Sequence, residues 1–460
     1  MDKQKVCVIG LGFVGSAMAT AIAISKSNNR PVYDVVGIDL DNKQGNERVN
    51  LINCGEFPFS TNDNHLKSAF KHAIRQGNLK ATTDKSVCSD ADIIIVDIQL
   101  DIDYLNNEPQ LEFDQFKNAI SEIGRLIAPE TLVIIETTVP PGTCEKVVVP
   151  TLESELNLRG LSIDNVLIAH SYERVMPGNE YLASITDYWR VFSGYTKIAA
   201  DACEVFLSNV INIDKYPLTR LNSTTASETA KVLENTYRAV NIAFIDEWTK
   251  FSEQVGIDLF EIIDAIRMRP THSNIRTPGV GVGGYCLTKD PTFAPASAKQ
   301  IFNTDLCFPF SSLAVQVNHN MPLHVVSRLD KLMNRDIGGS KVLICGVSYR
   351  QDIGDTRYSP SELLVQKMIS LGVNIVCHDP YVSYWDELGI SLVKELPKAN
   401  LFDAVVFAVP HQQYKTIDLV SWASGCNLLL DANSVLNKEQ RKDLRDHNIR
   451  VESIGRGDGL

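Results

Sequence analysis

The sequence predicts an α/β protein in which two doubly wound lobes are joined by a long central helix and a helical middle domain. Short apolar runs alternate with helical segments from the start of the chain, and the same alternation returns at residue 341. Between these regions, residues 223–256 follow a helical pattern. Because buried apolar runs separated by helices are typical of parallel sheets, each alternating region is expected to form one open sheet.

The first region contains strand-like apolar runs. They are KVCVIG (5–10), YDVVGID (33–39), ADIIIVD (91–97), TLVIIETT (131–138) and NVLIAHS (165–171). The uncharged stretch 6–24 could also be a signal peptide or a membrane helix. Three glycines at fixed spacing within it, and the strand that follows, favour a strand and helix of a sheet. No membrane association is therefore expected.

The middle region is helical. One helix is expected from Ser223 to about Gly256, and a second at 258–266. Apolar residues at spacings of three and four form one stripe along the first helix: Ala230, Leu233, Tyr237, Val240, Phe244 and Trp248. Because this helix is long for one domain, it is expected to brace neighbouring parts or a second subunit of a homodimer or higher homo-oligomer.

The last region begins after the GGS of 338–340 and again alternates. Its strand-like runs are KVLICGVSYR (341–350), NIVCHDP (374–380), AVVFAVP (404–410) and NLLLDAN (427–433). It opens like the start of the chain, with Lys-Val, an apolar run and Gly346. The next residues are Val347, Ser348 and Tyr349, so the full glycine fingerprint is missing. The two lobes are therefore expected to share an architecture and to bind different ligands.

Composition narrows the class of protein. A chain of 460 residues is expected to hold about three domains. The formal net charge of -12 argues against a nucleic-acid-binding protein. The ten cysteines form no CxxC pair, so no metal site is expected, and Cys7 and Cys345 lie in apolar runs typical of buried thiols. These features predict a reducing, cytoplasmic location.

A dinucleotide fingerprint, G-x-G-x-x-G, follows the first strand. It is formed by Gly10, Leu11, Gly12, Phe13, Val14 and Gly15. The glycines permit a tight turn, close approach to a pyrophosphate and helix–strand packing, as in Rossmann-like lobes. Asp39 ends the second strand, where an acid binds the ribose hydroxyls and repels a 2′-phosphate. NAD is therefore predicted over NADP; the alternative is an apolar hairpin with Asp39 in a turn.

A cysteine follows the glycine-rich run GVGVGGYCLTKDP (279–291). With a nicotinamide cofactor, a thiolate can add to an aldehyde, and the adduct can lose a second hydride to give a thioester that water releases as an acid. Cys286 could supply the thiolate, Lys231 a cation, and Glu173 a carboxylate; Asn235 lies one turn after Lys231. From spacing alone, a cysteine such as Cys286 is more often a small buried hydrophobe, and a pair such as Lys231–Asn235 is more often a solvated face.

The sequence resembles the nucleotide-sugar 6-dehydrogenases, the family of UDP-glucose, UDP-N-acetylhexosamine and GDP-mannose dehydrogenases. The resemblance covers nearly the whole chain, in order: VIGLGFVG, IIETTVPPGT, HSYERVMPGN, ASETAKVLENTYRAVNIAF, GVGVGGYCLTKDP, GVSYRQDIGDTRYSP and IGRG. It implies a two-step oxidation of the sugar C6 alcohol to a carboxylate, with two NAD consumed, for polysaccharide biosynthesis. The GNE after Pro177 and the helix LENTYRAVNIAF resemble the N-acetylhexosamine branch more than the glucose branch.

The resemblance implies catalytic roles. Cys286 matches the nucleophile that forms a thiohemiacetal, and Lys231 matches the lysine that stabilises oxyanions. Asn235 and Asp290 match residues that orient the sugar and the catalytic water or lysine, so Asp290 is expected to partner Lys231. Glu173 matches the base of thioester hydrolysis.

Binding roles are implied in the same way. Thr138 matches a threonine that holds an active-site water. The implied cofactor-binding residues are Gly10, Gly12, Phe13, Val14, Gly15, Asp39, Thr138 and Arg357. The implied substrate-binding residues are Glu173, Arg174, Lys231, Asn235, Gly283, Gly284 and Arg350. The implied domains are an NAD-binding domain (1–210), a central dimerisation domain with the cysteine loop (211–325) and a UDP-binding domain (326–460).

Three segments depart from the family pattern. The usual phenylalanine-lysine near the start of the third lobe reads Tyr349-Arg350, and arginine can still bind phosphate. The segment after Asp431 reads Ala432-Asn433-Ser434, without the substrate-binding arginine often found there. The usual proline-threonine-proline after the third strand reads Asp97-Ile98-Gln99.

Two other functions fit part of the sequence. A single-step β-hydroxyacid dehydrogenase has similarly arranged lobes, and would release one NADH without needing Cys286. A non-catalytic NAD-binding sensor would explain the fingerprint and Asp39. It would leave Cys286, Lys231 and Glu173 without a joint role.

Overall fold

The computed structural model describes residues 3–27, 30–105, 108–334 and 336–457. Contacts group the chain into two compact units. The first unit comprises Met1–Glu234 and Thr292–Cys307, and the second comprises Asn235–Pro291 and Phe308–Leu460. Helix α8 (Thr224–Val255) begins in the first unit and continues into the second. The division into three domains stays a prediction.

The first unit is built on one large sheet. Its strands are, in spatial order, β12 (Thr219–Arg220), β11 (Val191–Gly194), β10 (Leu167–His170), β9 (Leu132–Ile135), β6 (Ile93–Val96), β1 (Gln4–Ile9), β4 (Tyr33–Ile38) and β5 (Leu79–Thr82). The strands from β10 to β5 are parallel, and β11 is antiparallel to β10. The order of the parallel strands is that of a dinucleotide-binding sheet, whose switch point lies between β1 and β6.

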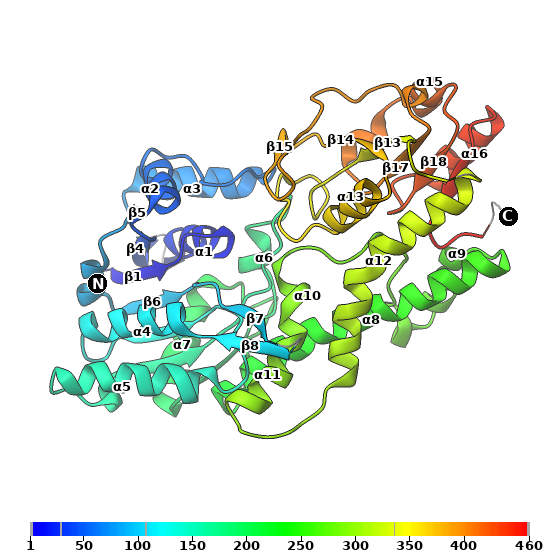
Figure 1. Ribbon diagram of the computed structural model, residues 1–460. Helices are drawn as coiled ribbons and strands as arrows, with labels where there is room; N and C mark the ends of the chain where they lie inside the picture. Colours follow the sequence, from blue (N-terminus) through cyan, green and yellow to red (C-terminus); the bar gives the residue numbers. More distant parts are fainter. Residues whose placement is uncertain (1–2, 28–29, 106–107, 335, 458–460) are drawn as a thin grey trace. The chain divides into compact units, whose positions relative to one another are not determined.

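Helices cover both faces of this sheet. They are α1 (Phe13–Ala23), α2 (Lys43–Asn53), α3 (Asn64–Gln76), α4 (Asp114–Leu126), α5 (Val149–Leu158), α6 (Ala183–Thr186), α7 (Lys197–Val210) and α11 (Phe293–Gln300). Strand side chains alternate between two cores: Val6 and Val8 pack with α1 and α3, whereas Cys7 packs with α4 and α5. Figure 1 shows α1 and α3 on one side of the sheet and α4 and α5 on the other. Two hairpins, β2 (Lys26–Ser27) with β3 (Arg30–Pro31) and β7 (Asp101–Leu105) with β8 (Glu108–Glu112), lie outside the sheet.

The second unit contains a smaller parallel sheet. Its strands are, in order, β14 (Asn374–His378), β13 (Lys341–Cys345), β17 (Ala404–Phe407), β18 (Leu429–Asp431) and β19 (Val451–Ser453). This order places the switch point between β13 and β17. The fifth strand, β19, was not predicted, because three residues with Glu452 at their centre give no apolar run. The same unit also contains a separate antiparallel hairpin, formed by β15 (Tyr384–Trp385) and β16 (Ile390–Ser391).

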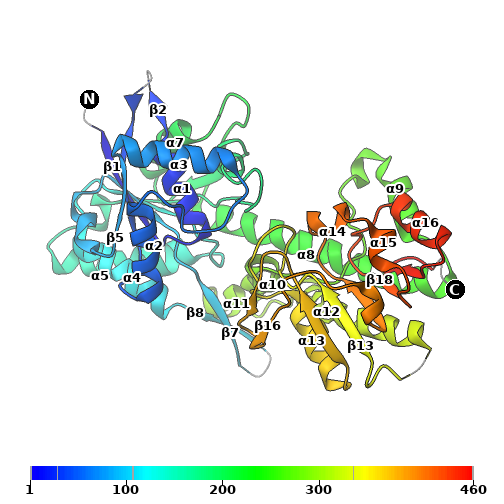
Figure 2. The ribbon, with the colours of Figure 1, turned by 90° about the horizontal axis from the view of Figure 1, so that it is seen from above.

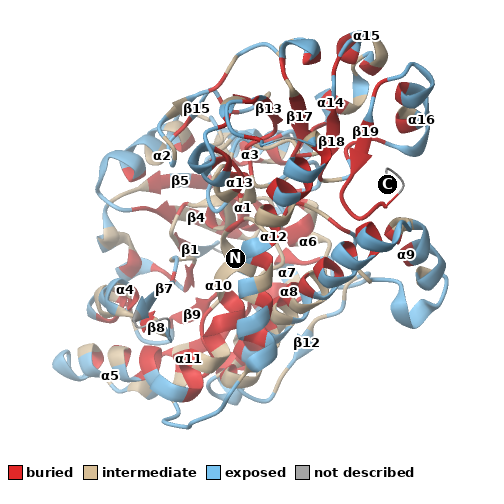
Figure 3. Ribbon diagram, turned by 45° about the vertical axis from the view of Figure 1, so that its right-hand side comes forward, coloured by how far each residue is buried: buried red, intermediate tan, exposed pale blue. Residues whose placement is uncertain are grey.

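Its helices are α9 (Leu259–Arg267), α10 (Tyr285–Lys289), α12 (Pro309–Met333), α13 (Pro360–Ser370), α14 (Gln412–Thr416), α15 (Leu419–Ala423) and α16 (Lys438–Asp446). Figure 2 shows α12 and α13 beside β13. The side chains of β13 again alternate: Val342 and Ile344 pack with α12 and α13, and Leu343 with α15 and α16. In Figure 3 the strands of this sheet are buried, whereas α9 shows exposed surface. The two predicted doubly wound lobes are confirmed.

The uncharged stretch 6–24 forms β1, the glycine loop and α1. Among the residues that the structure describes, no helix is both long and apolar enough to cross a bilayer.

The predicted long helix is confirmed as α8, yet its apolar stripe is exposed. Leu233 is 65% exposed and Tyr237 50%, and Phe244 and Trp248 are also exposed. The buried face of α8 carries small and polar residues instead, among them Glu228, Lys231, Asn235, Ala239, Thr249 and Ser252. The interpretation of Lys231 and Asn235 as a solvated face is therefore wrong.

Candidate active site

The glycine loop after β1 fits a dinucleotide. Gly10 has a φ of +97°, and a Cβ there would collide with the carbonyl of Asp97. A Cβ on Gly15 would collide with the carbonyl of Gly10, so α1 lies directly against the loop. Beside Gly12 there is open space, and α1 begins directly after it. These features allow backbone N–H groups to meet a pyrophosphate.

Asp39 lies at the carboxyl end of β4, where the ribose hydroxyls are predicted to bind. Its Oδ1 accepts a hydrogen bond from the Leu40 N–H at 2.8 Å, and its Oδ2 lies 2.9 Å from Nη1 of Arg48. Phe13, in the fingerprint, stacks on Phe59 with ring centroids 4.1 Å apart. Arg48, nine residues after Asp39 on α2, was missed by the sequence reasoning, which examined only the acid.

A buried charged group lies at the switch point. Asp97 follows β6 and Glu136 follows β9, and Nη1 of Arg190 donates to Oε1 of Glu136 at 2.5 Å. Burial, the charge of Glu136 and that of Glu173 raise the pKa of Asp97 well above its usual range. Asp97 Oδ2 and Glu136 Oε2 find no N–H or O–H partner among the described residues. The raised pKa of Asp97 favours its protonated form, and Arg190 faces the charge that remains on Glu136.

Glu173 and Lys231 come together within the first unit. Glu173 lies in the loop after β10, and Lys231 lies on α8. The Lys231 Nζ donates to the Glu173 carbonyl at 2.7 Å and lies 3.9 Å from its Oε1. Only 7% of the Lys231 side chain and 13% of the Glu173 side chain are exposed. The arrangement places a desolvated cation beside a carboxylate, the combination that oxyanion stabilisation and water activation need.

Arg174, predicted to bind substrate, is held within the protein. Its Nη2 lies 2.8 Å from Oε2 of Glu234, and its Nε is 3.1 and 3.0 Å from the two Glu234 oxygens. Nη2 also donates to the Tyr172 hydroxyl at 3.1 Å. These bonds hold the loop that carries Glu173 against α8. Direct contact of Arg174 with the substrate stays a prediction.

Glu228 ties the segment after β9 to α8. Its Oε2 accepts a hydrogen bond from the Gly142 N–H at 2.6 Å, and its Oε1 accepts one from the Cys144 N–H at 2.7 Å. Thr138, predicted to hold a water, lies in the same segment and is half-buried. Burial raises the pKa of Glu228 to about 7, and the hydrogen bonds oppose that rise. Glu228 was not singled out from sequence, because a lone glutamate on a helix gives no signal.

Replacing Glu228 by glutamine is expected to lower stability by ~1–3 kcal/mol, because one backbone N–H then faces an amide donor. The folded carboxyl binds a proton more tightly than the unfolded one, whose pKa is near 4.5. Its contribution to stability is therefore complete below pH 4.5 and is lost as the pH rises through about 7. The glutamine variant lacks this dependence, so its deficit should shrink from pH 5 to pH 8.

Midpoints of thermal unfolding at pH 5 and pH 8 test this expectation. Glu153→Gln, an exposed position on α5 of the same unit, is the matched control and should behave like the parent protein. A deficit for Glu228→Gln that grows toward pH 8 would contradict it.

In the second unit, Cys286 lies at the start of α10. Gly284 precedes the helix with a φ of +80°, and the cysteine is exposed. The interpretation of Cys286 as a small buried hydrophobe is therefore wrong, whereas Cys7 and Cys345 are buried as predicted. None of the ten cysteines, all of which lie in the described part of the chain, forms a disulfide.

The glycines before Cys286 make room for protein side chains. A Cβ on Gly284 would come within 2.8 Å of the Tyr349 ring. A Cβ on Gly283 would come within 2.8 Å of both Pro360 and Tyr349. The loop is therefore packed directly against the segment that follows β13. Contact of these glycines with the substrate stays a prediction.

Asp290 and Asn235 are paired within the second unit. The Asn235 Nδ2 donates to Asp290 Oδ2 at 2.7 Å, and Lys289 Nζ lies 2.9 Å from Asp290 Oδ1. Both Asn235 and Asp290 are buried. The expected pairing of Asp290 with Lys231 stays a prediction; Asn235 and Lys289 are the partners seen in this unit.

The loop after β13 cannot offer its N–H groups to a dinucleotide. Asp379 follows β14 as Asp39 follows β4, yet its Oδ2 accepts from the N–H groups of Val347 (2.9 Å) and Ser348 (3.1 Å). His411 fixes the carboxylate: its Nδ1 accepts from the Asp352 N–H, so Nε2 carries the proton and donates to Asp379 at 3.0 Å. This protein carboxylate occupies the donors that a phosphate would need.

The remaining predicted residues of this unit lie around the same sheet edge. Arg350 is exposed. Arg357, predicted to reach the cofactor, pairs with Asp355 through two hydrogen bonds of 2.9 and 2.6 Å. Asn433, where the family often has an arginine, donates to the Ala408 carbonyl at 2.9 Å. Its amide therefore links the loops after β17 and β18.

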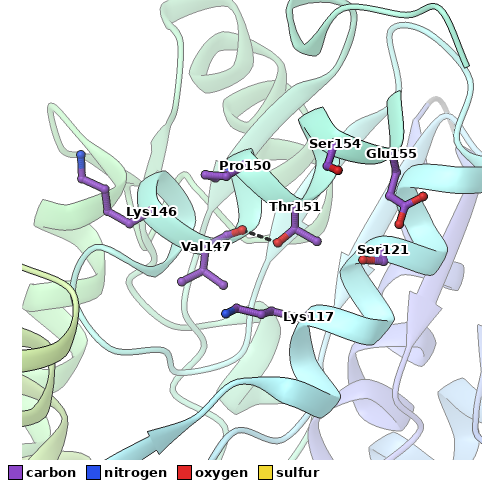
Figure 4. A pocket seen from close by; sticks show the side chains of 8 residues that line it. All are labelled: Lys117, Ser121, Lys146, Val147, Pro150, Thr151, Ser154 and Glu155. Carbon is purple, nitrogen blue, oxygen red and sulfur yellow. Dashed lines mark hydrogen bonds between the residues drawn. The ribbon is translucent and has the colours of Figure 1, made fainter. Parts of the chain in front are cut away.

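One pocket of about 380 Å³ lies on the outside of the first unit, between α4 and the start of α5 (Figure 4). It is lined by Lys117, Ser121, Lys146, Val147, Pro150, Thr151, Ser154 and Glu155. The Thr151 hydroxyl donates to the Val147 carbonyl at 2.7 Å, a bond within the helix. None of these residues is among the predicted site residues.

Family models match three consecutive parts of the chain. Residues 4–201 match the NAD binding domain of the UDP-glucose/GDP-mannose dehydrogenase family, residues 225–320 its central domain, and residues 343–438 its UDP binding domain.

Named relatives and solved structures span nearly the whole chain. A UDP-N-acetyl-D-mannosamine dehydrogenase of Methanocaldococcus jannaschii is 32% identical over 95% of this chain and 93% of its own length. The structure of a UDP-D-ManNAc dehydrogenase from Pyrococcus horikoshii is 27% identical, with a TM-score of 0.83, and covers 99% of this chain and 100% of its own. That of an NDP-N-acetyl-D-galactosaminuronic acid dehydrogenase from Methanosarcina mazei Go1 is 25% identical, with a TM-score of 0.80, over 99% and 96%.

Proposed function

The chain belongs to the UDP-glucose/GDP-mannose dehydrogenase family, and on this premise we propose that it oxidises the C6 hydroxymethyl group of a UDP-N-acetylhexosamine to a carboxylate. The observation that carries the proposal is the exposed thiol of Cys286 in an NAD-dependent family. The product is a uronic acid donor for polysaccharide biosynthesis. The single-step dehydrogenase and the sensor are not favoured, because neither gives Cys286 a task.

The residues divide the chemistry between them. When bound, NAD accepts one hydride in each of two successive oxidations. Cys286 adds as a thiolate to the C6 aldehyde, so that a carbon–sulfur bond forms and the oxygen becomes a thiohemiacetal hydroxyl. Loss of that proton and a second hydride leaves a thioester. Glu173 takes a proton from the attacking water, the carbon–sulfur bond breaks, and the carboxylate and the free thiol are released.

The cation and the polar pair support these steps. The ammonium of Lys231, which is already desolvated, stabilises the negative charge that develops on the C6 oxygen. We assign orientation of the sugar to the Asn235–Asp290 pair, whose short hydrogen bond fixes the amide. Thr138 holds the water. Arg174 stabilises the Glu173 loop through its bond with Glu234.

The nucleotide and cofactor contacts complete the assignment. Gly283, Gly284 and Arg350 belong to the substrate site, with Arg350 exposed and available to a phosphate. Arg357 belongs to the cofactor site.

The sugar is proposed to be N-acetylated. The M. jannaschii and P. horikoshii relatives are named for UDP-N-acetyl-D-mannosamine, so UDP-N-acetylmannosamine is the first substrate to test. The GNE motif after Pro177 points to the same branch.

We also propose a homodimer that buries the exposed face of α8. Apolar side chains gather there: Leu233, Tyr237, Phe244, Trp248, Phe251 and Val255 are each at least 45% exposed. An exposed apolar patch of this kind marks an association surface. The cysteines, none of which forms a disulfide, and the nucleotide substrate support a cytoplasmic location.

An assay of NADH against nucleotide sugars tests the function. UDP-N-acetylmannosamine, UDP-N-acetylglucosamine, their galacto epimers, UDP-glucose and GDP-mannose form the panel. Two NADH per sugar and a product heavier by the change from CH₂OH to COOH are expected for an N-acetylated UDP-sugar. One NADH per substrate would indicate the single-step dehydrogenase. NAD binding without NADH formation on any sugar would indicate the sensor.

A further inference from the structure

We propose that the adenosine end of the NAD site contains a latent 2′-phosphate site in Arg48, which the charge of Asp39 alone keeps from accepting NADP. An acid at this strand end selects NAD through the ribose hydroxyls, whereas an arginine nearby accommodates the 2′-phosphate of NADP. This chain has both groups, in direct contact. The inference rests on NAD as the cofactor and not on the identity of the sugar.

The acid and the arginine form a partly buried ion pair. Asp39 is 8% exposed, and its Oδ2 lies 2.9 Å from Nη1 of Arg48. The other oxygen, Oδ1, accepts from the Leu40 N–H. Asp39 therefore neutralises the guanidinium next to the position where the ribose hydroxyls bind. A dianionic phosphate brought there would meet the carboxylate as well as the cation.

The arginine is held in place by more than the acid. Arg48 lies on α2, and its guanidinium carbon is 5.8 Å from the Phe59 ring centroid, within the range of a cation–π contact. Phe59 in turn stacks on Phe13 of the glycine fingerprint. The Arg48 side chain is 29% exposed, so it is open to a ligand from solvent. Removing the charge of Asp39 would therefore leave a positioned, unpaired guanidinium, which binds phosphate through two parallel N–H groups.

Binding of NADH and NADPH to the purified full chain, followed by nicotinamide fluorescence without any sugar, tests the proposal. The parent protein should bind NADH more tightly than NADPH by on the order of a hundredfold, from like-charge repulsion at Asp39. In Asp39→Asn, NADPH should bind at least about tenfold more tightly than in the parent, and no more weakly than NADH. In the double variant Asp39→Asn/Arg48→Leu this gain should disappear.

Two further variants keep the result interpretable. Asp39→Ser removes the same charge with a smaller side chain, and should show the same gain if the asparagine variant fails to fold. Arg75→Leu, an exposed arginine on α3, removes one positive charge elsewhere in the unit and should leave both affinities unchanged. No gain for NADPH in either Asp39 variant, or a gain that survives loss of Arg48, would overturn the proposal. Because no sugar is present, a failure of the proposed oxidation would not affect these outcomes.

Discussion

Replacing Cys286 by serine should abolish formation of the acid product. A serine hydroxyl has no accessible anionic form near neutral pH, so it cannot capture the C6 aldehyde as a thiolate does. Steady-state turnover to the acid is expected to fall on the order of 10³-fold or more, as when a nucleophile is removed. Serine and cysteine differ only in one side-chain atom, and Cys286 is exposed on a short helix. The substitution is therefore not expected to disturb the packing of a core.

The measurement is NADH formation together with product mass, in the parent protein and in Cys286→Ser. Cys307→Ser removes another exposed thiol and is the matched control, expected to retain full activity. Cys286→Ala adds a stricter test, because it leaves no hydroxyl. Four-electron turnover in the alanine variant would show that the covalent mechanism is wrong.

The architecture could be predicted from sequence because its signals are local. The runs around Val6, Ile94 and Leu343 are apolar on both faces of a strand, as burial between two layers of helices requires. The fingerprint glycines predict a turn whose tightness the φ of Gly10 confirms. The short strand β19 could not be predicted, because its burial is imposed by its neighbour β18 and not by its own residues.

The burial of polar groups could not be read from spacing. Lys231 and Asn235 have the pattern of a solvated face, and only the packing of α8 makes them buried. The apolar stripe on the same helix is exposed at Tyr237 and Trp248 in the single chain, so its expected contact with a second subunit stays a prediction. Helical periodicity identifies a face but not what covers it, so both patterns needed the fold to be interpreted.

Long-range ion pairs were also beyond the sequence. Arg190, just before β11, pairs with Glu136, which lies 54 residues earlier in the chain, a separation at which no motif links them. Arg48 lies only nine residues after Asp39, and a basic residue on the helix that follows a ribose-binding acid is a signal that could have been used. A matching position in the sequence can also mislead. Asp379 follows its strand as Asp39 does, but its carboxylate accepts hydrogen bonds from the N–H groups of the loop after β13.

Replacing Glu173 by glutamine should separate oxidation from hydrolysis. The change is isosteric, and the glutamine oxygen can still accept the hydrogen bond that Glu173 takes from the Val175 N–H. Both hydride transfers should proceed, because neither needs the carboxylate as a base for water. Thioester hydrolysis should slow by on the order of 10²–10⁴-fold, the contribution of a general base.

The expected record is therefore a burst of two NADH per active site followed by a slow steady state. Intact-protein mass should rise by one acyl nucleotide sugar, and Cys286→Ser in the same background should remove the adduct. Glu153→Gln, an exposed glutamate on α5 of the same unit, is the control and should show neither burst nor adduct. Steady turnover without an adduct in Glu173→Gln would assign the base to another group. The carboxyl pair of Asp97 and Glu136 would then be the next candidate, because the charge of Glu173 already acts on both.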